Sequence, residues 1–496
     1  KHTIKIFRVY SLNRKIQILD KNCNKKKEAF ELAKKSLKLE KELSKISLKE
    51  IDKVLKYDDF QRKINLAGAH TQLANLYNNN SELKNKIKLY EDAVKILEST
   101  DLYNKNNLLD YNYSILSNFY IKIGNFKQAE KFKNKNLDYM KNRYGEGTSE
   151  YAEAFKNLYF LYQDQGHYDY ALQTLLDIQK TVDVNLLYKN SEGDHNMSQI
   201  KFTHLLGKAY YRINDYDNAI ESNYKVLNYI KSQKSLVKEE KKINNILLWE
   251  NVVLGDLALY IESKFYQTGD LKYLDDAEKI YLQVINIQET SNNQKMKDQL
   301  FITKDNLSSI YLSRNENEKA LPLVEEAYAE CVRINNEKDK ICMGQMISTA
   351  NVISFFNLPK SIDMLEKFLK LEHKTNDSFL RQRVNARGSL SYMYSQIGNN
   401  KRADELMIES INLIDPTDSR FRDVYANQMN SYYLSVSKSG QARSAVNGYL
   451  ELIEFINENV SDVGNILPEV FNNLGFAYSL IPDQKKALKF YLESEI

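Results

Sequence analysis

The chain has 496 residues, of which 43% are hydrophobic and 27% charged, so it can build a continuous core and is not of disordered composition. Its 5 prolines and 16 glycines are too few for turn-dense β architectures, which need such residues at most reversals. A formal net charge of +4 creates no field that would require a nucleic-acid partner. We therefore predict a folded, all-α protein.

Residues 1–60 are predicted to form a basic helical cap at the amino-terminal end, with an amphipathic helix at 25–45. Residues 1–57 hold 17 Lys/Arg against 7 Asp/Glu, a formal charge of +10. An arm with this charge could contact RNA, DNA or an anionic membrane. Its acids, such as Glu28 and Glu40, are interspersed as on a solvated helix face, so nucleic acid is disfavoured as a partner.

The segment 151–180 shows a repeated unit most clearly. Phe155, Leu158 and Tyr162 recur at helical spacing, Gly166 marks a turn, and Ala171 opens a second apolar stripe. Small residues such as Ala171 let two antiparallel helices approach closely. The pattern predicts two helices joined by a tight reversal.

Similar units recur along residues 61–496, and we predict roughly ten of them. Successive leucines of the first helix fall 42 to 51 residues apart between Leu116 and Leu307. The recognised copies are anchored at Leu73, Leu116, Leu158, Leu206, Leu257, Leu307, Leu390 and Leu474, and their second helices carry Ala93, Ala129, Ala171, Ala219, Ala277, Ala320, Ala403 and Ala487.

This constellation of Leu, a small residue, Tyr and Ala resembles the tetratricopeptide repeat (TPR) family. The resemblance implies a right-handed superhelical solenoid of antiparallel helix pairs, with a concave groove lined by first helices. The period is nearer 42 than 34, and so resembles kinesin light chains and many bacterial signalling proteins. The segment 267–285 also looks like an insert of the repeat arms that precede caspase-like CHAT peptidase domains.

The resemblance further implies which residues face the groove, because in this family they flank the leucine anchor. Asn is suited to hold the main chain of an extended peptide, since its amide both donates and accepts. Asn is also abundant throughout this composition, which would explain it without a ligand. The predicted peptide-binding residues are Lys156, Asn157, His204, Lys208, Asn306, Asn472 and Asn473.

The clamp that some members of the family use for a terminal carboxylate is not conserved in this chain. Its second Asn would fall at Phe160, Lys208 and Ser309 in successive copies. Phe160, Tyr392 and Phe476 instead predict aromatic contacts, either in the groove or between helices.

No catalytic residues, metal site or cofactor are predicted. The six histidines include no pair at i, i+4, the spacing of two metal ligands on one helix face. Cys23, Cys331 and Cys342 are too scattered for a disulfide framework, and Cys331 is predicted to be a buried thiol. This pattern, with no membrane span, favours a reducing, cytoplasmic location, although the chain begins at Lys1 and leaves a removed signal open.

Three functions are compatible with the sequence. The first is a scaffold that binds a protein or peptide in its groove. The second is the regulatory arm of a larger enzyme such as a CHAT peptidase, because the chain ends at Ile496 after a second helix, without a polar capping helix. The third is the sensor of a transcriptional or signalling regulator.

Overall fold

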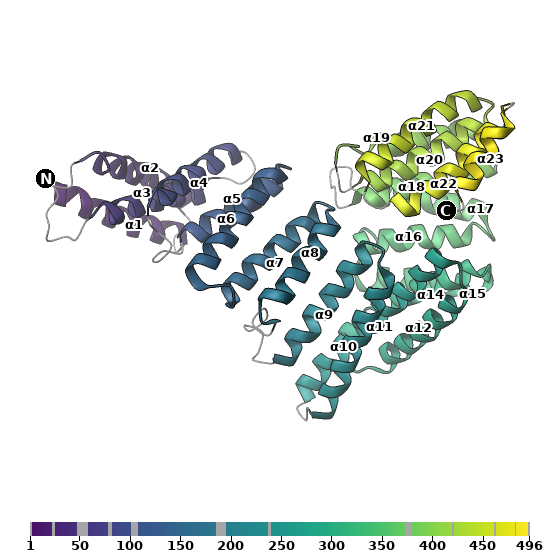
Figure 1. Ribbon diagram of the computed structural model, residues 1–496, viewed down its shortest axis with the longest axis horizontal. Coiled ribbons are helices and arrows are strands. Elements are labelled where there is room, and N and C mark those ends of the chain that lie inside the picture. The colour runs from purple at the N-terminus through teal and green to yellow at the C-terminus, as the bar shows by residue number, and fades with distance from the viewer. Residues whose placement is uncertain are drawn as a thin grey trace. The chain divides into compact units, whose positions relative to one another are not determined.

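The computed structural model describes residues 2–21, 25–46, 58–77, 82–100, 108–184, 195–236, 240–372, 379–418, 421–460, 463–481 and 483–494. In these ranges all regular secondary structure is helical (Figure 1). The predicted all-α fold class is therefore confirmed.

The chain divides into two compact units. The first comprises Lys1–Gln163 with Gln173–Gly193, and the second Asp164–Leu172 with Asp194–Ile496, so the boundary runs through α8 (Tyr168–Thr181). The first unit contains α1 (His2–Lys21), α2 (Lys26–Leu43), α3 (Asp59–Leu76), α4 (Leu83–Glu98), α5 (Leu108–Lys122), α6 (Phe126–Tyr144) and α7 (Ser149–Asp164).

The second unit contains the remaining helices. They are α9 (His195–Arg212), α10 (Tyr216–Leu236), α11 (Glu240–Thr268), α12 (Lys272–Thr290), α13 (Gln294–Lys297), α14 (Leu300–Ser313), α15 (Asn317–Ile334), α16 (Lys340–Ile353), α17 (Leu358–Leu371), α18 (Leu380–Gln396), α19 (Asn400–Asn412), α20 (Arg422–Lys438), α21 (Ala442–Asn459), α22 (Val463–Ser479) and α23 (Gln484–Glu493).

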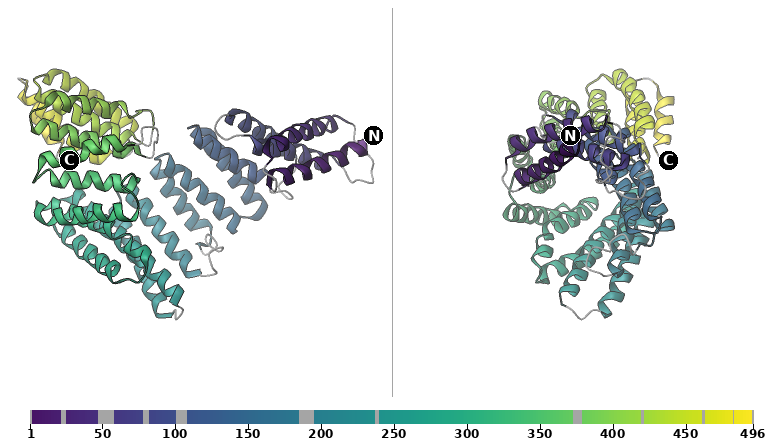
Figure 2. Two further views of the ribbon diagram at one scale, coloured as in Figure 1. Left: turned by 180° about the vertical axis from the view of Figure 1, so that it is seen from behind. Right: turned by 90° about the vertical axis from the view of Figure 1, so that its left-hand side faces the viewer.

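Within each unit the contacts are local along the chain. Most helices pack against the next helix, and α16 also touches α18 just as α20 touches α22. The views from two sides show these successive pairs in chain order inside the second unit (Figure 2). This is the contact pattern of a repeat array, in which each pair buries its apolar face only against its neighbours.

The residues that predicted the repeat are the residues that build its core. All the predicted leucine anchors lie in first helices and all the paired alanines in second helices, and each of these side chains is at most 7% exposed. Alanine at the crossing lets the two backbones approach, while leucine fills the space between turns. The predicted antiparallel helix pairs are confirmed.

In most of the helix pairs whose turn the structure describes, one turn residue has a positive φ. Glycine occupies that position at Gly166 (φ 74°) and Gly398 (φ 77°), whereas Asn214 (φ 60°) and Asn315 (φ 58°) occupy it in other repeats. Asn is the residue that best tolerates this left-handed conformation after glycine. The Asn-rich composition therefore has a structural use at these turns.

The prediction that the cysteines form no disulfide is wrong for Cys331 and Cys342. Cys331, near the end of α15, and Cys342, near the start of α16, form a disulfide with a Cα–Cα distance of 5.5 Å. Both residues are fully buried, as predicted for Cys331, but neither is a free thiol. The short turn between the two helices brings together cysteines that are 11 positions apart in the sequence, which spacing alone did not reveal.

The predicted cap and array boundaries stay a prediction. The amphipathic helix expected at 25–45 corresponds to α2, which packs between α1 and α3 through Ala29 and Ala33. At the other end, Leu488 and Leu492 of α23 are 60% and 54% exposed.

Candidate functional site

A groove of about 1190 Å³ lies along the first helices α16, α18 and α20 of the second unit. We call it the α16–α20 groove. Helix α14 contributes Asp305 to its lining, and α19 contributes Asn400, Ala403, Asp404 and Met407. The lining is mostly small, amide or hydroxyl side chains. They include Gly344, Gln345, Ser348, Asn351, Gln382, Asn385, Gly388, Ser389, Tyr392, Ser395, Gln396, Asn400, Gln428, Ser431 and Ser435.

Two glycines lie in the helical walls of this groove. Gly344 is inside α16, and a Cβ built on it would have no heavy atom within 4 Å. Gly388 is inside α18, where a Cβ would lie 3.5 Å from the amide of Gln428, an ordinary contact. Glycine within a helix costs roughly 0.5–1 kcal/mol relative to alanine. Neither packing nor backbone conformation requires glycine at Gly344, which lines the groove.

An orphaned acceptor is the main polar feature of the groove. The Nε2 of Gln345 donates to Asp305 Oδ2 on α14 at 3.0 Å, while Gln345 Oε1 is buried without a hydrogen-bond partner. An ionised carboxylate only accepts, so the NH₂ of Gln345 must face Asp305 and its oxygen must face away. Gln382 on α18 also has a buried carbonyl oxygen without a partner. The groove wall therefore contains two amide oxygens, those of Gln345 and Gln382, that accept no hydrogen bond.

The charges of the groove are few and of both signs. Lys340 and Lys438 line it together with Asp305 and Asp404. Arg381 Nη1 pairs with Asp423 Oδ2 at 2.9 Å. Burial raises the pKa of Asp305 to about 6, against hydrogen bonds from Gln345 and Ser348 that lower it. The groove is therefore a polar surface of low net charge.

Tyr392 supplies the largest exposed aromatic surface of the groove. Its side chain is 64% exposed on α18, one turn after Gly388. The sequence predicted an aromatic at this position either for the groove or for packing between helices. The exposure places Tyr392 in the groove. Of the other two predicted aromatics, Phe160 is 45% exposed on α7 and Phe476 is half-buried on α22, and neither lines this groove.

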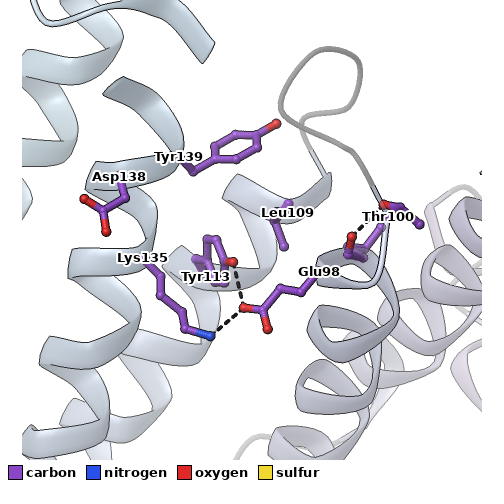
Figure 3. Close-up of a pocket in the computed structure, with 8 residues that line it drawn as sticks. Glu98, Thr100, Leu109, Tyr113, Lys135, Asp138 and Tyr139 are labelled. Atoms are coloured by element: carbon purple, nitrogen blue, oxygen red, sulfur yellow. Dashed lines mark hydrogen bonds and ion pairs between the residues drawn. The ribbon is translucent and has the colours of Figure 1, made fainter. Parts of the chain in front are cut away.

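A smaller cavity of about 280 Å³ lies in the first unit between α4, α5 and α6 (Figure 3). Glu98 accepts hydrogen bonds there from Tyr113 Oη at 2.8 Å and Lys135 Nζ at 2.6 Å. Both donors belong to the first unit, so the Glu98 carboxylate is already paired within that unit. This cavity has no orphaned polar atom among its described lining residues and is the weaker candidate.

No family model and no curated protein matches the chain. The apo quorum sensor NprR from B. thuringiensis is 16% identical over 81% of this chain and 100% of that chain, with a TM-score of 0.47. A human IFIT1 dimer with PPP-AAAA is 14% identical over 91% and 96%, with a TM-score of 0.41. A tetratricopeptide repeat protein from Parabacteroides merdae is 12% identical over 64% and 98%, with a TM-score of 0.39.

These TM-scores lie below 0.5, so the fold assignment rests on the helix pairs and their buried anchors. The fold is that of a TPR-type helical-repeat array. The likeness to the repeat arms of CHAT proteins stays a prediction. No helix in the described ranges is long and apolar enough to cross a membrane.

The predicted peptide-binding residues do not line the α16–α20 groove. Lys156 and Asn157 lie on α7, His204 and Lys208 on α9, Asn306 on α14, and Asn472 and Asn473 on α22. Lys156 pairs with Glu153 of its own helix. Asn157 and Asn306 are half-buried, whereas Lys208 and Asn472 are exposed.

Two of these predicted residues instead connect successive TPR-type repeats. His204 is 5% exposed, and its Nε2 lies 2.7 Å from Asp256 Oδ2 on α11. Asn473 is 7% exposed and donates to Asn430 Oδ1 on α20 at 3.0 Å. Their polar groups are engaged with the neighbouring first helix.

The groove residues Gly344 and Gln345 were missed because the repeat around α16 is degenerate and has no leucine anchor of the recognised type. Gln382 lies on α18, eight residues before the anchor Leu390, and so outside the positions that flank the anchor. One signal was available. Isolated glycines inside helical segments, as at Gly344 and Gly388, indicate a packing or functional reason.

Proposed function

We propose that the chain is a binding scaffold that holds an extended segment of another polypeptide in the α16–α20 groove. The observation that carries this proposal is the unpartnered Oε1 of Gln345, which is buried in the groove wall. A buried acceptor without a donor costs roughly 1–3 kcal/mol. Because this oxygen is shielded from solvent, a ligand N–H recovers that free energy once the Gln345 side chain turns toward the groove.

Main-chain N–H groups fit this acceptor best. An extended peptide presents such donors at regular intervals, so it can reach Gln345 on α16 and Gln382 on α18 together. Gly344 and Gly388 leave room for a backbone to approach these walls. Tyr392 offers an apolar face to a ligand side chain.

The charge of the groove favours a polypeptide over a nucleic acid. Binding to RNA or DNA draws on rows of Lys and Arg that neutralise phosphates. Here Lys340 and Lys438 are accompanied by Asp305 and Asp404, and Arg381 is already paired. Acceptors such as Gln345 Oε1 would also repel phosphate oxygens.

The peptide-binding residues predicted from the sequence lie outside the α16–α20 groove, so they would form a second, independent set of binding residues. Asn157 on α7 and Asn472 on α22 belong to that set, and their replacement by alanine tests it. Whether the array acts alone or as the regulatory arm of a larger enzyme or regulator is a further prediction on which no described residue bears.

The test selects peptides of about twelve residues from a random display library against the full chain. Affinity of a selected peptide is then measured by fluorescence anisotropy for the wild type, Gly344→Ala and Gln345→Leu. We expect each variant to bind at least about tenfold more weakly, which corresponds to 1.4 kcal/mol. Gly255→Ala is the matched control, because Gly255 is also helical with open space around its Cβ but lies on α11, outside the groove.

Three results would contradict the proposal. The library could yield no binder, the selected peptides could bind Gly344→Ala and Gln345→Leu as tightly as the wild type, or a single-stranded RNA oligonucleotide could displace them from the groove.

A further inference from the structure

The disulfide between Cys331 and Cys342 lies directly beside the groove. Cys342 is in the first turn of α16, two residues before Gly344 and three before Gln345. Cys331 is in the last turn of α15, so the bond ties the second helix of one repeat to the first helix of the next. It therefore fixes the helix that carries the orphaned acceptor.

The surroundings of the bond are those of a permanent structural link. Both cysteines are fully buried and pack with Phe301 and Ala327 in one apolar cluster. The side chain of Asn335, in the turn between the helices, lies 3.7 Å from Cys331 Sγ and 4.0 Å from Cys342 Sγ. The Cα–Cα distance of 5.5 Å is in the middle of the usual range for disulfides.

We infer that Cys331 and Cys342 are an oxidation site, joined in the working protein by thiol–disulfide exchange, and that this link holds the amino-terminal turn of α16 in place. This inference is independent of the proposed function. It contradicts the reducing location favoured by the sequence, because structural disulfides persist in oxidising compartments.

The oxidant in this exchange is a low-molecular-weight disulfide such as oxidised glutathione. The thiolate of one cysteine attacks a sulfur of the oxidant, forming a mixed disulfide and releasing one thiol. The thiolate of the other cysteine then attacks the protein sulfur of that mixed disulfide and releases the second thiol. Two protein thiols are oxidised and one oxidant disulfide is reduced. Because both sulfurs are buried after folding, exchange must occur before this repeat closes or during its local opening.

The first test counts thiols in the full chain after refolding in a glutathione redox buffer. The protein is denatured without reductant, alkylated with N-ethylmaleimide and weighed by mass spectrometry. We expect one adduct, on Cys23, and a peptide in which Cys331 and Cys342 are cross-linked. Three adducts, or glutathione attached to Cys331 or Cys342, would overturn the inference.

The second test measures the role of the link by hydrogen exchange of the oxidised and reduced wild type, which have the same sequence. Closing an 11-residue loop covalently corresponds to about a hundredfold difference in the local opening equilibrium. We expect amides in the last turn of α15 and the first turns of α16 to exchange about a hundredfold faster after reduction, whereas amides of α11 stay unchanged. Equal rates at α15 and α16 in both forms would contradict a structural role. Cys23→Ala, carried through both tests, removes the third thiol as a control.

Discussion

Two regions of the second unit are built from consecutive first helices and differ in whether the helices are in polar contact. One is the contact of His204 on α9 with Asp256 on α11, which we call the α9–α11 joint, and the other is the α16–α20 groove. In the joint, Asp256 on α11 is 2.7 Å from His204 and 3.6 Å from Lys208 Nζ on α9. The ring of His204 also meets Trp249 edge to face, with centroids 5.5 Å apart. In the groove, Gln345 and Gln382 keep carbonyl oxygens without donors.

The difference shows that a polar residue on a first helix does not by itself mark a binding surface. His204 fits the sequence pattern of a groove residue, but its polar group is paired with the next repeat. Gln345 has a pairing partner for only one of its two amide ends. What distinguishes His204 from Gln345 is therefore whether the polar group is paired within the array. Buried amide oxygens without a partner also occur outside the groove, at Asn223 and Asn251.

The largest expected effect is at Arg387 on α18, which does not line the groove. Arg387 donates to Glu372 through two bonds, at 2.8 and 2.6 Å, and both residues are 8% exposed. Arg387→Ala removes both close hydrogen bonds from the buried Glu372 carboxylate and leaves it only Arg383 Nε at 3.5 Å, so we expect a loss of about 3 kcal/mol in urea unfolding. Arg381→Ala, which breaks the more exposed pair with Asp423, should cost at most about 1 kcal/mol. Equal losses would show that the Arg387 pair is not effectively buried.

Breaking the contact between α9 and α11 should lower the stability of the protein but leave peptide binding unchanged. His204→Ala removes the close partner of Asp256, and we expect the unfolding free energy to fall by about 1–3 kcal/mol. The affinity for a selected peptide should stay within about twofold of the wild type, in contrast to Gln345→Leu. A large loss of affinity in His204→Ala with unchanged stability would reverse the comparison and support the predicted site on α9.

The groove should carry a pH dependence of its own. Burial raises the pKa of Asp305 to about 6, above its value in the unfolded chain, so the folded state holds this proton to higher pH. The contribution of this group to stability is greatest below about pH 4 and is lost as the pH rises through about 6. Asp305→Asn should therefore raise the unfolding free energy by about 2 kcal/mol at pH 8 and leave it nearly unchanged at pH 4. Urea unfolding at pH 4 and at pH 8 measures this change in unfolding free energy. A gain of the same size at both pH values would contradict the assigned pKa.

The smallest effect should be the same in both regions. Gly398, in the turn between α18 and α19, and Gly269, in the turn between α11 and α12, have φ of 77° and 72°. Alanine at either position should cost about 1 kcal/mol, because a Cβ disfavours the left-handed conformation. Thermal unfolding of the two variants measures this cost. A marked difference between them would mean that the turns, and not only the polar pairing, separate the two regions.

The amino-acid sequence by itself determined the repeated helix pair. Leucine anchors such as Leu158 and Leu390 and alanines such as Ala171 and Ala403 specify it locally, because helical periodicity and small crossing residues act over short stretches of chain. The same local reasoning could not find the groove or the disulfide. Whether His204 or Asn473 is free depends on a partner about 40 to 50 residues away. The pairing of Cys331 with Cys342, and the acceptor that Asp305 orients on Gln345, also arise only when one helix is packed against the next, so tertiary structure decided them.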